Sequence, residues 1–480
     1  MALSSLARRP AWARISTHSL GRADLAVLGF CALGAGNVFA RRGAGNTVVA
    51  PSPPQFVLGV ALVVLACVFC YMAIGRPSTL PGAAICTVAI ALQTCLQPAF
   101  LLPPPAVYAV GLVIAAVPLV RSGRFAWPLI AAGAVSNAWA VAAAWTWGSA
   151  PIDVFAEVQG ATAAFLSGHN PYSPVFKVFL DQQNGHVTFG TGSFCYGPMV
   201  VLLSIPARLL GDVRLTVVAL NLAILAAVLV WARRAGHDGR MTRMLTALWL
   251  ASPFVPFMVL TEWTDSFCVA GMAWWLVLRE RHRAWATVAL TMGIASKPSV
   301  LLVMVPLLFW MREVRREVIW SAAATAVIVA PFALWTGLPQ FVYDTVGVFA
   351  DLPIRHDGVT VDGVASIVGH AFVPGGLLVV GIAVSLAAFT LRRPRDYGSL
   401  TASGAGLLIA VCLFGKQAFL NYYYIAGMVL LFTIASGAMV PCDALASPLD
   451  RLSVLGRRLA GVLVQRPSVQ RAAGSKPAES

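Results

Sequence analysis

The sequence predicts an all-α fold, a polytopic bundle of transmembrane helices, from two observations. Hydrophobic residues make up 59% of the 480-residue chain and charged residues only 11%, whereas soluble domains carry roughly 25% charged residues. Apolar runs of about 16–22 residues also recur along the chain, and an α-helix needs about this length to cross the ~30 Å hydrocarbon core. Because backbone groups in lipid must pair internally, we expect these runs to be helices.

About fourteen crossings are predicted, five before a long, mostly polar loop and nine after it. The expected helices span residues 24–40, 56–75, 80–101, 105–120, 126–147, 213–232, 242–260, 264–279, 284–297, 299–311, 318–336, 375–391, 399–414 and 420–440. The run 196–211, YGPMVVLLSIPARLLG, is short and contains two prolines. We therefore expect a re-entrant or interfacial helix there rather than a crossing.

The chain divides into three parts on this basis. Residues 1–23 are a cytoplasmic segment, and residues 24–440 are the transmembrane domain with large outer loops at 148–195 and 337–374. The first of these loops is expected to be amphipathic and partly helical. Residues 441–480 are expected to form a basic amphipathic helix on the cytoplasmic leaflet, followed by a disordered tail.

The net charge of +15 is dispersed in short arginine clusters between the apolar runs. The clusters are Arg76; Arg121 and Arg124; Arg233, Arg234, Arg240 and Arg243; Arg279, Arg281 and Arg283; Arg312, Arg315 and Arg316; and Arg392, Arg393 and Arg395. With the N-terminus in the cytoplasm and fourteen crossings, every cluster falls inside, which is the positive-inside pattern. Nucleic-acid binding needs a continuous basic footprint, so we expect no nucleic-acid partner.

Nine cysteines lie mostly inside apolar runs. Cys67 and Cys70 have the CxxC spacing, but one such pair without a second pair or a nearby histidine is a weak metal signal. We expect the cysteines to be small, buried apolar residues.

The same topology places a mixed set of polar residues at the outer ends of the helices. They are Asp153, Glu157, the loop 168–195, Glu262, Asp265, Lys297, Asp344, Arg355, His356, Asp357, Lys416 and Tyr422 to Tyr424. Insertion explains arginines inside, but it does not explain acids, lysines, histidines and tyrosines outside, and ionisable groups at membrane depth are expensive and usually functional. A mixed-charge outer cavity is the clearest functional signal in the sequence.

Asp153 has two compatible interpretations, a helix cap and a functional carboxylate. It stands just before VFAEVQGATAAFL, residues 154–166, where an aspartate can cap a helix N-terminus. That stretch has an imperfect amphipathic pattern, which suits a helix lying along the membrane surface. The following SGHNPYSP ends the helix and turns the chain, but a turn does not require His169 or Tyr172.

Lys297, next to Pro298, lies between two apolar runs. A lysine that snorkels from a helix end is one interpretation. Its predicted outer position runs against the positive-inside trend, however, and a lysine at a helix break is well placed to meet an anion. Glu262 and Asp265 are one helical turn apart, so they either share a functional face or cap and pair with a cation. The tyrosines after Lys416 either form an aromatic belt or line a site.

Three stretches together resemble a known group of membrane enzymes. They are the segment that Asp153 heads and GHNPYSP ends, the run YGPMVVLLSIPARLLG, and SKPSVLLVMVPLL followed downstream by NYYYIAGMVLL. The group is the GT-C glycosyltransferases that use polyprenyl-phosphate sugars, and the closest likeness is to the actinobacterial polyprenyl-phosphomannose-dependent mannosyltransferases. The resemblance spans about residues 125–440, and the Gly-x-Asn-Pro-Tyr turn is its most characteristic motif. Several members carry two adjacent acids in the first outer loop, whereas here Asp153 stands alone until Glu157.

The resemblance implies transfer of a sugar, mannose in the closest relatives, from a polyprenyl phosphate to a lipid or glycan acceptor at the outer face of the cell membrane. Asp153 would be the general base that takes the proton of the acceptor hydroxyl. Cations that hold the departing phosphate would be Lys297, Arg355, His356 and Lys416. Sugar or acceptor ligands would be Glu157, His169, Asn170, Tyr172, Glu262, Trp263, Asp265 and Tyr422. No metal or other cofactor is implied, because a lipid-phosphate leaving group carries less charge than a nucleotide diphosphate and no DxD signature occurs.

The alternative is a polytopic transporter or lipid flippase with an outer polar cavity. Transporters tend to carry charges near the bilayer midplane and often contain inverted repeats. Here the charges gather at one face and no repeat is visible, so the sequence favours the transferase.

Overall fold

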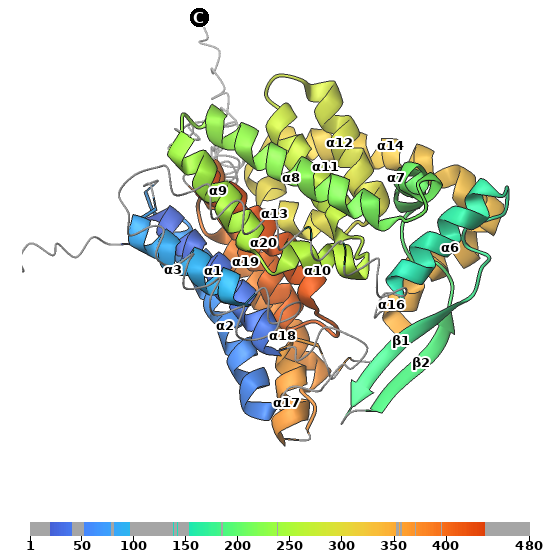
Figure 1. Cartoon of the computed structure of the whole chain (residues 1–480), viewed down its shortest axis with the longest axis horizontal. Coiled ribbons are helices and arrows are strands. Elements are labelled where there is room, and N and C mark those ends of the chain that lie inside the picture. The colour runs from blue at the N-terminus through green and yellow to red at the C-terminus, as the bar shows by residue number, and fades with distance from the viewer. Residues whose placement is uncertain are drawn as a thin grey trace, which may run out of the picture.

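The computed structural model describes residues 20–40, 52–77, 81–96, 138, 142, 153–183, 186–237, 239–351, 355, 358–369, 371–394 and 396–436. Within these ranges the chain is a helical bundle with one β-hairpin projecting from its edge (Figure 1). The predicted helices at 105–120 and 126–147 lie outside the described residues, apart from two isolated positions of the second. The predicted amphipathic helix and tail at 441–480 lie outside them as well, as does most of the segment 1–23.

The elements follow the chain in this order. The N-terminal helices are α1 (Arg22–Ala40), α2 (Pro53–Ala73) and α3 (Ala83–Leu96); the first large loop holds α6 (Val154–Leu166), β1 (Phe176–Gln183) and β2 (His186–Gly192). Then come α7 (Pro198–Leu209), α8 (Arg214–Arg234), α9 (Gly239–Ala251), α10 (Phe254–Thr261), α11 (Asp265–Leu278), α12 (Arg283–Ser296), α13 (Val300–Trp310) and α14 (Arg312–Thr336). The second large loop holds α15 (Leu338–Val342), a π-helical turn η5 (Tyr343–Gly347), α16 (Val348–Asp351) and α17 (Val361–Gly369), and the chain ends in α18 (Gly375–Leu391), α19 (Tyr397–Leu413) and α20 (Leu420–Ala435).

Most predicted helices are present and begin or end within a few residues of the expected positions. The expected range 375–391 coincides with α18, and the break at Lys297–Ser299 separates α12 from α13 where Pro298 predicted it. The expected helix 242–260 is instead two helices, α9 and α10, bent by 47°. Pro253 stands at that bend, where it lacks the N–H that would continue a helical hydrogen-bond ladder.

Helix length limits how many crossings the described residues support. Four helices, α1, α2, α8 and α14, are long and apolar enough to cross a membrane, and the bent pair α9–α10 makes a fifth if it is one span. Seven further apolar helices have only 10–17 residues. The chain is therefore a helical protein with several candidate membrane spans, and the prediction of about fourteen crossings is not confirmed. The run predicted not to cross forms α7, whose 12 residues extend about 18 Å, less than the ~30 Å core.

The described residues are mostly helical as predicted, including α6 in the partly helical first large loop, but that loop also contains β1 and β2, which pair in an antiparallel hairpin. Their register runs from Phe176 opposite Gly192 to Gln183 opposite His186, so two residues connect the strands. These are Asn-Gly in the sequence, the dipeptide most favoured in two-residue hairpin turns. In Figure 1 the hairpin extends away from the helices, beside the labels of α6 and α16.

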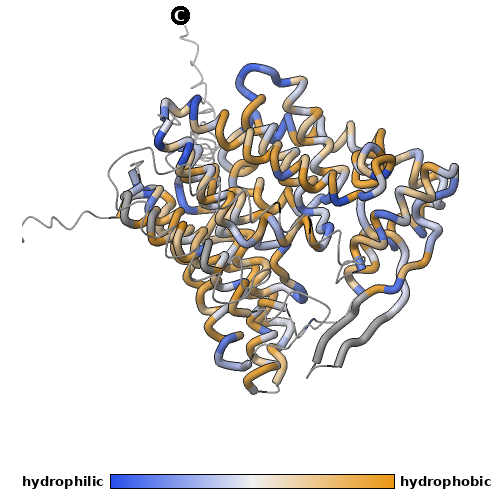
Figure 2. The backbone as a smooth tube through the Cα atoms, in the orientation of Figure 1, coloured by the Kyte–Doolittle hydropathy of each residue, from blue (hydrophilic) through white to orange (hydrophobic). Residues whose placement is uncertain are grey.

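Burial separates a central layer from a peripheral one. The apolar window of α1 is 83% buried, whereas that of α14 is only 17% buried. The outward side chains of α14 are large and apolar, including Trp320 and Leu334. Figure 2 shows hydrophobic residues along the helices and hydrophilic ones gathered mostly at the turns. This pattern fits a bundle whose outer helices face lipid.

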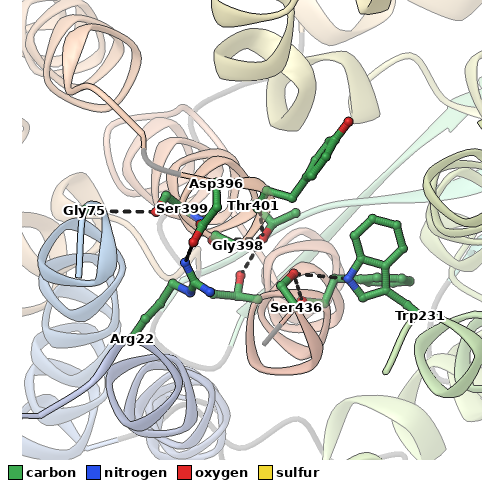
Figure 3. Close-up of polar contacts among 11 residues, drawn as sticks. Arg22, Gly75, Trp231, Asp396, Gly398, Ser399, Thr401 and Ser436 are labelled. Carbon is green, nitrogen blue, oxygen red and sulfur yellow. Dashed lines mark hydrogen bonds and ion pairs between the residues drawn. The ribbon is translucent and has the colours of Figure 1, made fainter. Parts of the chain in front are cut away.

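One end of the bundle is joined by arginine contacts (Figure 3). Arg22, at the start of α1, pairs with Asp396, which caps α19 by accepting from Ser399 N at 2.9 Å. Arg279, at the end of α11, donates to Tyr397 Oη at 2.6 Å and lies 3.3 Å from Glu317 of α14. The start of α1, the end of α11 and the start of α19 therefore meet here. The clusters at 233–243 and 312–316 adjoin the same ends of α8, α9 and α14.

Candidate functional site

The opposite end of the bundle is organised by the segment 193–197, between β2 and α7. Gly197 N donates to Ser296 O at 3.1 Å, so the segment touches the last residue of α12. A Cβ at Gly197 would lie 1.9 Å from Ala295 O, which no side chain tolerates. Glycine at this position therefore allows two backbones to meet, and it places Tyr196 beside Lys297.

Lys297 occupies the break between α12 and α13. Its Nζ lies 2.8 Å from Asp265 Oδ1 at the start of α11, and the other carboxylate oxygen of Asp265 accepts from Asn421 Nδ2, also at 2.8 Å. The ammonium lies 4.7 Å from the ring centroid of Tyr422 and 5.9 Å from that of Tyr196. Asp265 is fully buried, and the Lys297 side chain is 12% exposed. This cation is held by a carboxylate and flanked by two tyrosines, so it does not extend into solvent as a snorkelling lysine would.

The acids of α6 lie on the other side of the segment 193–197. Glu157 is 3% exposed, and Cys195 Sγ donates toward its Oε2 at 3.7 Å. Burial raises the pKa of Glu157 to about 8, and the charge of Asp153 raises it further in the same direction. Glu157 therefore holds its proton at neutral pH, which makes it a hydrogen-bond donor rather than a base.

Asp153 stands at the N-cap position of α6, but its side chain does not cap the helix. Its backbone is helical, with φ −65° and ψ −32°, and its side chain accepts no capping hydrogen bond. Only its carbonyl oxygen joins the helix, accepting from Glu157 N at 3.0 Å. The capping interpretation is wrong, because a side-chain cap needs an extended residue at this position.

Tyr196 lies between the two groups. Burial raises the pKa of its phenol well above the usual value, and the charges of Cys195, Glu157, Asp153 and then Tyr422 act in the same direction. The ring therefore lies within electrostatic range of both the acids of α6 and the tyrosine beside Lys297. No sequence motif singled out Tyr196, although it begins the YGPMVVLL run.

The turn predicted after α6 supports Tyr196 from behind. Asn170 Oδ1 accepts from Tyr172 N at 3.0 Å, and Asn170 Nδ2 donates to Thr336 Oγ1 of α14 at 3.2 Å. Tyr172 Oη donates to Tyr196 O at 2.9 Å, and its ring packs edge-on between Phe194 and Phe341. With 3% of its surface exposed, Tyr172 fixes the loop and leaves no face for a ligand to stack on. His169 is exposed on the turn itself.

Glu262 and Trp263 form the linker before Asp265. Glu262 ends α10 in a left-handed conformation, with φ 55°, and is fully buried. Trp263 packs on Phe257, with ring centroids 5.1 Å apart. Within the described residues, the predicted acids Glu262 and Asp265 thus differ completely in environment, since only Asp265 has hydrogen-bond partners.

Two of the remaining predicted cations, Arg355 and His356, belong to the second large loop, and Lys416 lies in the turn between α19 and α20. Arg355 stacks on Phe419, 4.4 Å from its centroid, and its backbone N–H donates to Lys416 O at 3.0 Å. Lys416 Nζ donates to Ala350 O at 2.8 Å. His356 lies outside the described residues. Phe419 O accepts from Tyr422 N at 3.0 Å, so this group connects to Lys297 through the start of α20.

Sequence reasoning missed Asn421, Cys195 and Tyr196. Each stands next to a residue that was singled out or inside a quoted motif, but none is charged. Asn421 precedes the tyrosine cluster, of which only Tyr422 faces Lys297, since Tyr423 donates to Val359 O and Tyr424 to Asn221 Oδ1. The aromatic-belt interpretation therefore does not apply to Tyr423 and Tyr424, which are fully buried.

The cysteines of the described residues form no metal site. Cys67 and Cys70 lie in α2 as free thiols, and Cys67 Sγ donates to Gly406 O at 3.7 Å. Across the described residues, no group of three or more His, Cys, Asp or Glu side chains is placed to hold a metal ion.

The fold and the site together define a class, a helical membrane protein with a buried polar site at one end. Comparison with known sequences is more specific, since residues 194–415 match the model of Glycosyltransferase family 87. The match covers slightly less than half of the chain and supports a membrane glycosyltransferase. It begins inside the segment 193–197 and includes Asp265 and Lys297, but it ends before Asn421. No curated protein and no solved structure matches the chain.

Proposed function

We propose that this protein transfers a sugar, with mannose the first candidate, from a polyprenyl-phosphate donor to a lipid or glycan acceptor at the outer face of the cell membrane. The observation that carries the proposal is the meeting of two acidic side chains, Asp153 and Glu157, and a buried lysine on either side of Tyr196. The acids come from α6, the lysine from the α12–α13 break, and these lie at the ends of helices opposite to the arginine contacts. The similarity to a glycosyltransferase family favours this reaction over a transporter or flippase.

Asp153 is the proposed general base. In the transfer, the acceptor oxygen attacks the anomeric carbon, its proton passes to the Asp153 carboxylate, and the bond from the anomeric carbon to the phosphate oxygen breaks. Glu157 holds its own proton at neutral pH, so the two acids divide the work as a base and a hydrogen-bond donor. Glu157 then orients the sugar or the acceptor.

Lys297 is the proposed partner of the departing phosphate, which gains negative charge as the bond breaks. Asp265 and Asn421 fix the lysine in place before the substrate arrives, and Tyr196 and Tyr422 surround its ammonium. A cation that is already positioned needs no reorganisation during the reaction. In this proposal Lys297 keeps its hydrogen bond to Asp265 while its ammonium also contacts the phosphate.

The other predicted residues keep proposed roles that fit their places. Arg355 and His356 of the second large loop and Lys416 of the turn between α19 and α20 extend the proposed phosphate-binding group. His169, exposed on the turn after α6, is the one proposed acceptor ligand at the surface. Asn170 and Tyr172 support Tyr196 through the contacts described above. Trp263 belongs to the linker that leads to Asp265 and packs on Phe257.

The test is in vitro transfer from a defined polyprenyl-phosphate mannose in membranes that contain the full-length protein. Asp153→Asn is expected to lower the rate by roughly 100-fold or more, in line with the loss of a general base, while the protein inserts normally. Glu280→Gln is the control, because Glu280 is an exposed acid at the arginine end of the bundle, and it is expected to leave the rate unchanged. A rate for Asp153→Asn equal to wild type would remove Asp153 from the reaction.

Asp153→Asn also separates transfer from transport. If product formation is unchanged but labelled lipid crosses the membrane more slowly, the protein moves lipid instead of transferring sugar. If no polyprenyl-phosphate sugar is consumed by the wild-type protein, the proposal fails.

A further inference from the structure

Glu262 is in an unfavourable position for a glutamate on two independent grounds. Its backbone is left-handed, with φ 55° and ψ 31°, and it is the one non-glycine residue with positive φ in the described part of the chain. Its side chain is also fully enclosed, and neither carboxyl oxygen has a hydrogen-bond partner among the described residues. Left-handed non-glycine residues and unpaired buried polar groups both carry a cost in folding.

Folding alone does not explain the glutamate. A glycine at 262 would adopt the left-handed conformation without strain, and it would bury no polar group. The neighbouring charges do not compensate the carboxyl either. Asp212 and Arg214 are the charges that act on it, and they pair with one another at 2.6 Å. Strain and unpaired groups of this kind persist where a ligand uses them.

The next hydroxyl along the linker is unpaired as well. Thr264 is 1% exposed, and its Oγ1 has no partner within the described residues. Glu262 and Thr264 together supply a carboxyl group and a hydroxyl group two residues apart in sequence, while the Trp263 ring packs on Phe257. Adjacent oxygen-bearing groups that accept and donate are complementary to the neighbouring hydroxyls of a sugar.

The linker also lies within reach of the proposed phosphate site. Asp265 is three residues after Glu262 and holds Lys297 at 2.8 Å. Three residues span at most about 11 Å, so a sugar attached to a phosphate at Lys297 lies within reach of residues 262–264. Within the described residues, the linker thus carries unpaired hydrogen-bonding groups close in sequence to Asp265, while Ser299 Oγ and Asn421 Oδ1 are unpaired close to Lys297.

We propose that Glu262 and Thr264 form a hydroxyl-recognition subsite that binds the sugar of the donor lipid. This inference rests on the proposed transferase function and deepens it. Because both residues are enclosed, the linker 262–264 moves when the sugar enters, and the left-handed residue is where the chain changes conformation. The unpaired carboxyl group then gains a partner from the sugar.

Glu262→Gly gives the sharpest test, because strain and substrate binding predict opposite effects on stability and activity. The full-length variant is expected to have a higher Tm than wild type and a rate of mannose transfer lower by about tenfold or more, the range for losing a hydrogen bond to a charged or buried partner. Glu262→Gln keeps the size and one hydrogen-bonding oxygen, so it is expected to retain more activity than Glu262→Gly. Donor lipid should raise the Tm of wild type more than that of Glu262→Gly.

Ser204→Ala is the matched control. Ser204, in α7, is also fully buried with an unpaired hydroxyl, and its loss is expected to leave transfer unchanged. An active wild type whose Glu262→Gly variant transfers at the same rate overturns the subsite alone, as does a Glu262→Gly variant that is less stable than wild type. A wild-type protein that neither uses nor is stabilised by polyprenyl-phosphate mannose overturns the proposed function and the subsite with it.

Discussion

At the scale of single residues, the site depends on the division between ionised and neutral groups. Asp265 is buried, but it is joined to both Lys297 and Asn421 at 2.8 Å. Removing one partner of such a buried pair leaves an uncompensated charge, which is more costly than the pair itself is stabilising. Glu157 is buried without a cation, so it avoids that cost by keeping its proton.

Glu157→Gln tests this protonation through stability. The folded pKa of about 8 lies above the ordinary value of 4.5, so the unfolded chain loses the proton first as the pH rises. Stability from the neutral carboxyl is therefore complete below pH 4.5 and is lost as the pH rises to about 8, with a slope on the order of 1.4 kcal/mol per pH unit. Glutamine cannot ionise, so the variant should flatten the fall in Tm across this window.

The measurement is Tm against pH from 4.5 to 8 for both proteins. Exposed Glu280→Gln is the control and should reproduce the wild-type curve. Parallel curves for wild type and Glu157→Gln would show that Glu157 is ionised in the folded protein.

Sequence reasoning at this scale found charged residues and missed neutral ones. Asp153, Asp265 and Lys297 were placed on one face by counting helices, since their charge is conspicuous among apolar residues. The sequence offered pairing with a cation as one alternative for Asp265, and the structure shows this pairing with Lys297; the choice of Lys297 and the position of Tyr196 could not be predicted in the same way. They depend on how a loop packs against a distant helix end, which no local pattern encodes.

At the scale of elements, the helices were predictable because apolar runs of helical length are strong signals. Prolines mark the breaks between helices. The break at Pro298 was predicted from the sequence, whereas the bend at Pro253 was not. The hairpin of β1 and β2 was not predicted although Asn-Gly marks its turn, because the strands are short and lie in a polar loop without a strong alternating apolar pattern. Within the described residues the two strands pair only with each other, so no further strand in the sequence indicated a sheet.

Gly197→Ala tests how the segment 193–197 joins the helices. The added Cβ would lie 1.9 Å from Ala295 O, and backbone atoms on both sides cannot give way as a flexible side chain would. We expect the unfolding free energy to fall by roughly 1–3 kcal/mol, as for overpacked sites, and sugar transfer to fall because Tyr196 moves away from Lys297.

Tm and transfer rate measure the two effects. Gly375→Ala, at the start of α18, is the control, because nothing lies within 4 Å of its added Cβ. If Gly197→Ala were as stable and as active as Gly375→Ala, the close approach of these two backbones would not be a feature of the protein in its membrane.

At the scale of the whole molecule, charge is sorted between two ends. Arginine contacts join one end, and the acids, Lys297 and tyrosines meet at the other. Counting helices from the sequence predicted this separation, because helices that alternate in direction return every basic turn to one side. The number of crossings does not follow from the sequence in the same way. The helices α11, α12 and α13 have only 14, 14 and 11 residues, fewer than the about 20 that a crossing needs.

Cysteine substitutions test which end faces outward. His169→Cys lies at the site end and Glu280→Cys at the arginine end, and both positions are exposed. In intact cells, a membrane-impermeant thiol reagent should label His169→Cys above the background of the native cysteines, and Glu280→Cys only after permeabilisation. Labelling of both positions in intact cells would contradict the proposed orientation.

The bond between Asp265 and Asn421 joins residues 156 positions apart, and this separation has a consequence for biosynthesis. The ribosome delivers the acids of α6 first, then Asp265 and Lys297, and Asn421 and Tyr422 only near the end of the chain. A nascent chain that stalls before α20 therefore carries Asp265 and Lys297 without Asn421, which donates to Asp265, and without Tyr422, which flanks Lys297. The polar site is thus complete only when the last helix has been synthesised and packed.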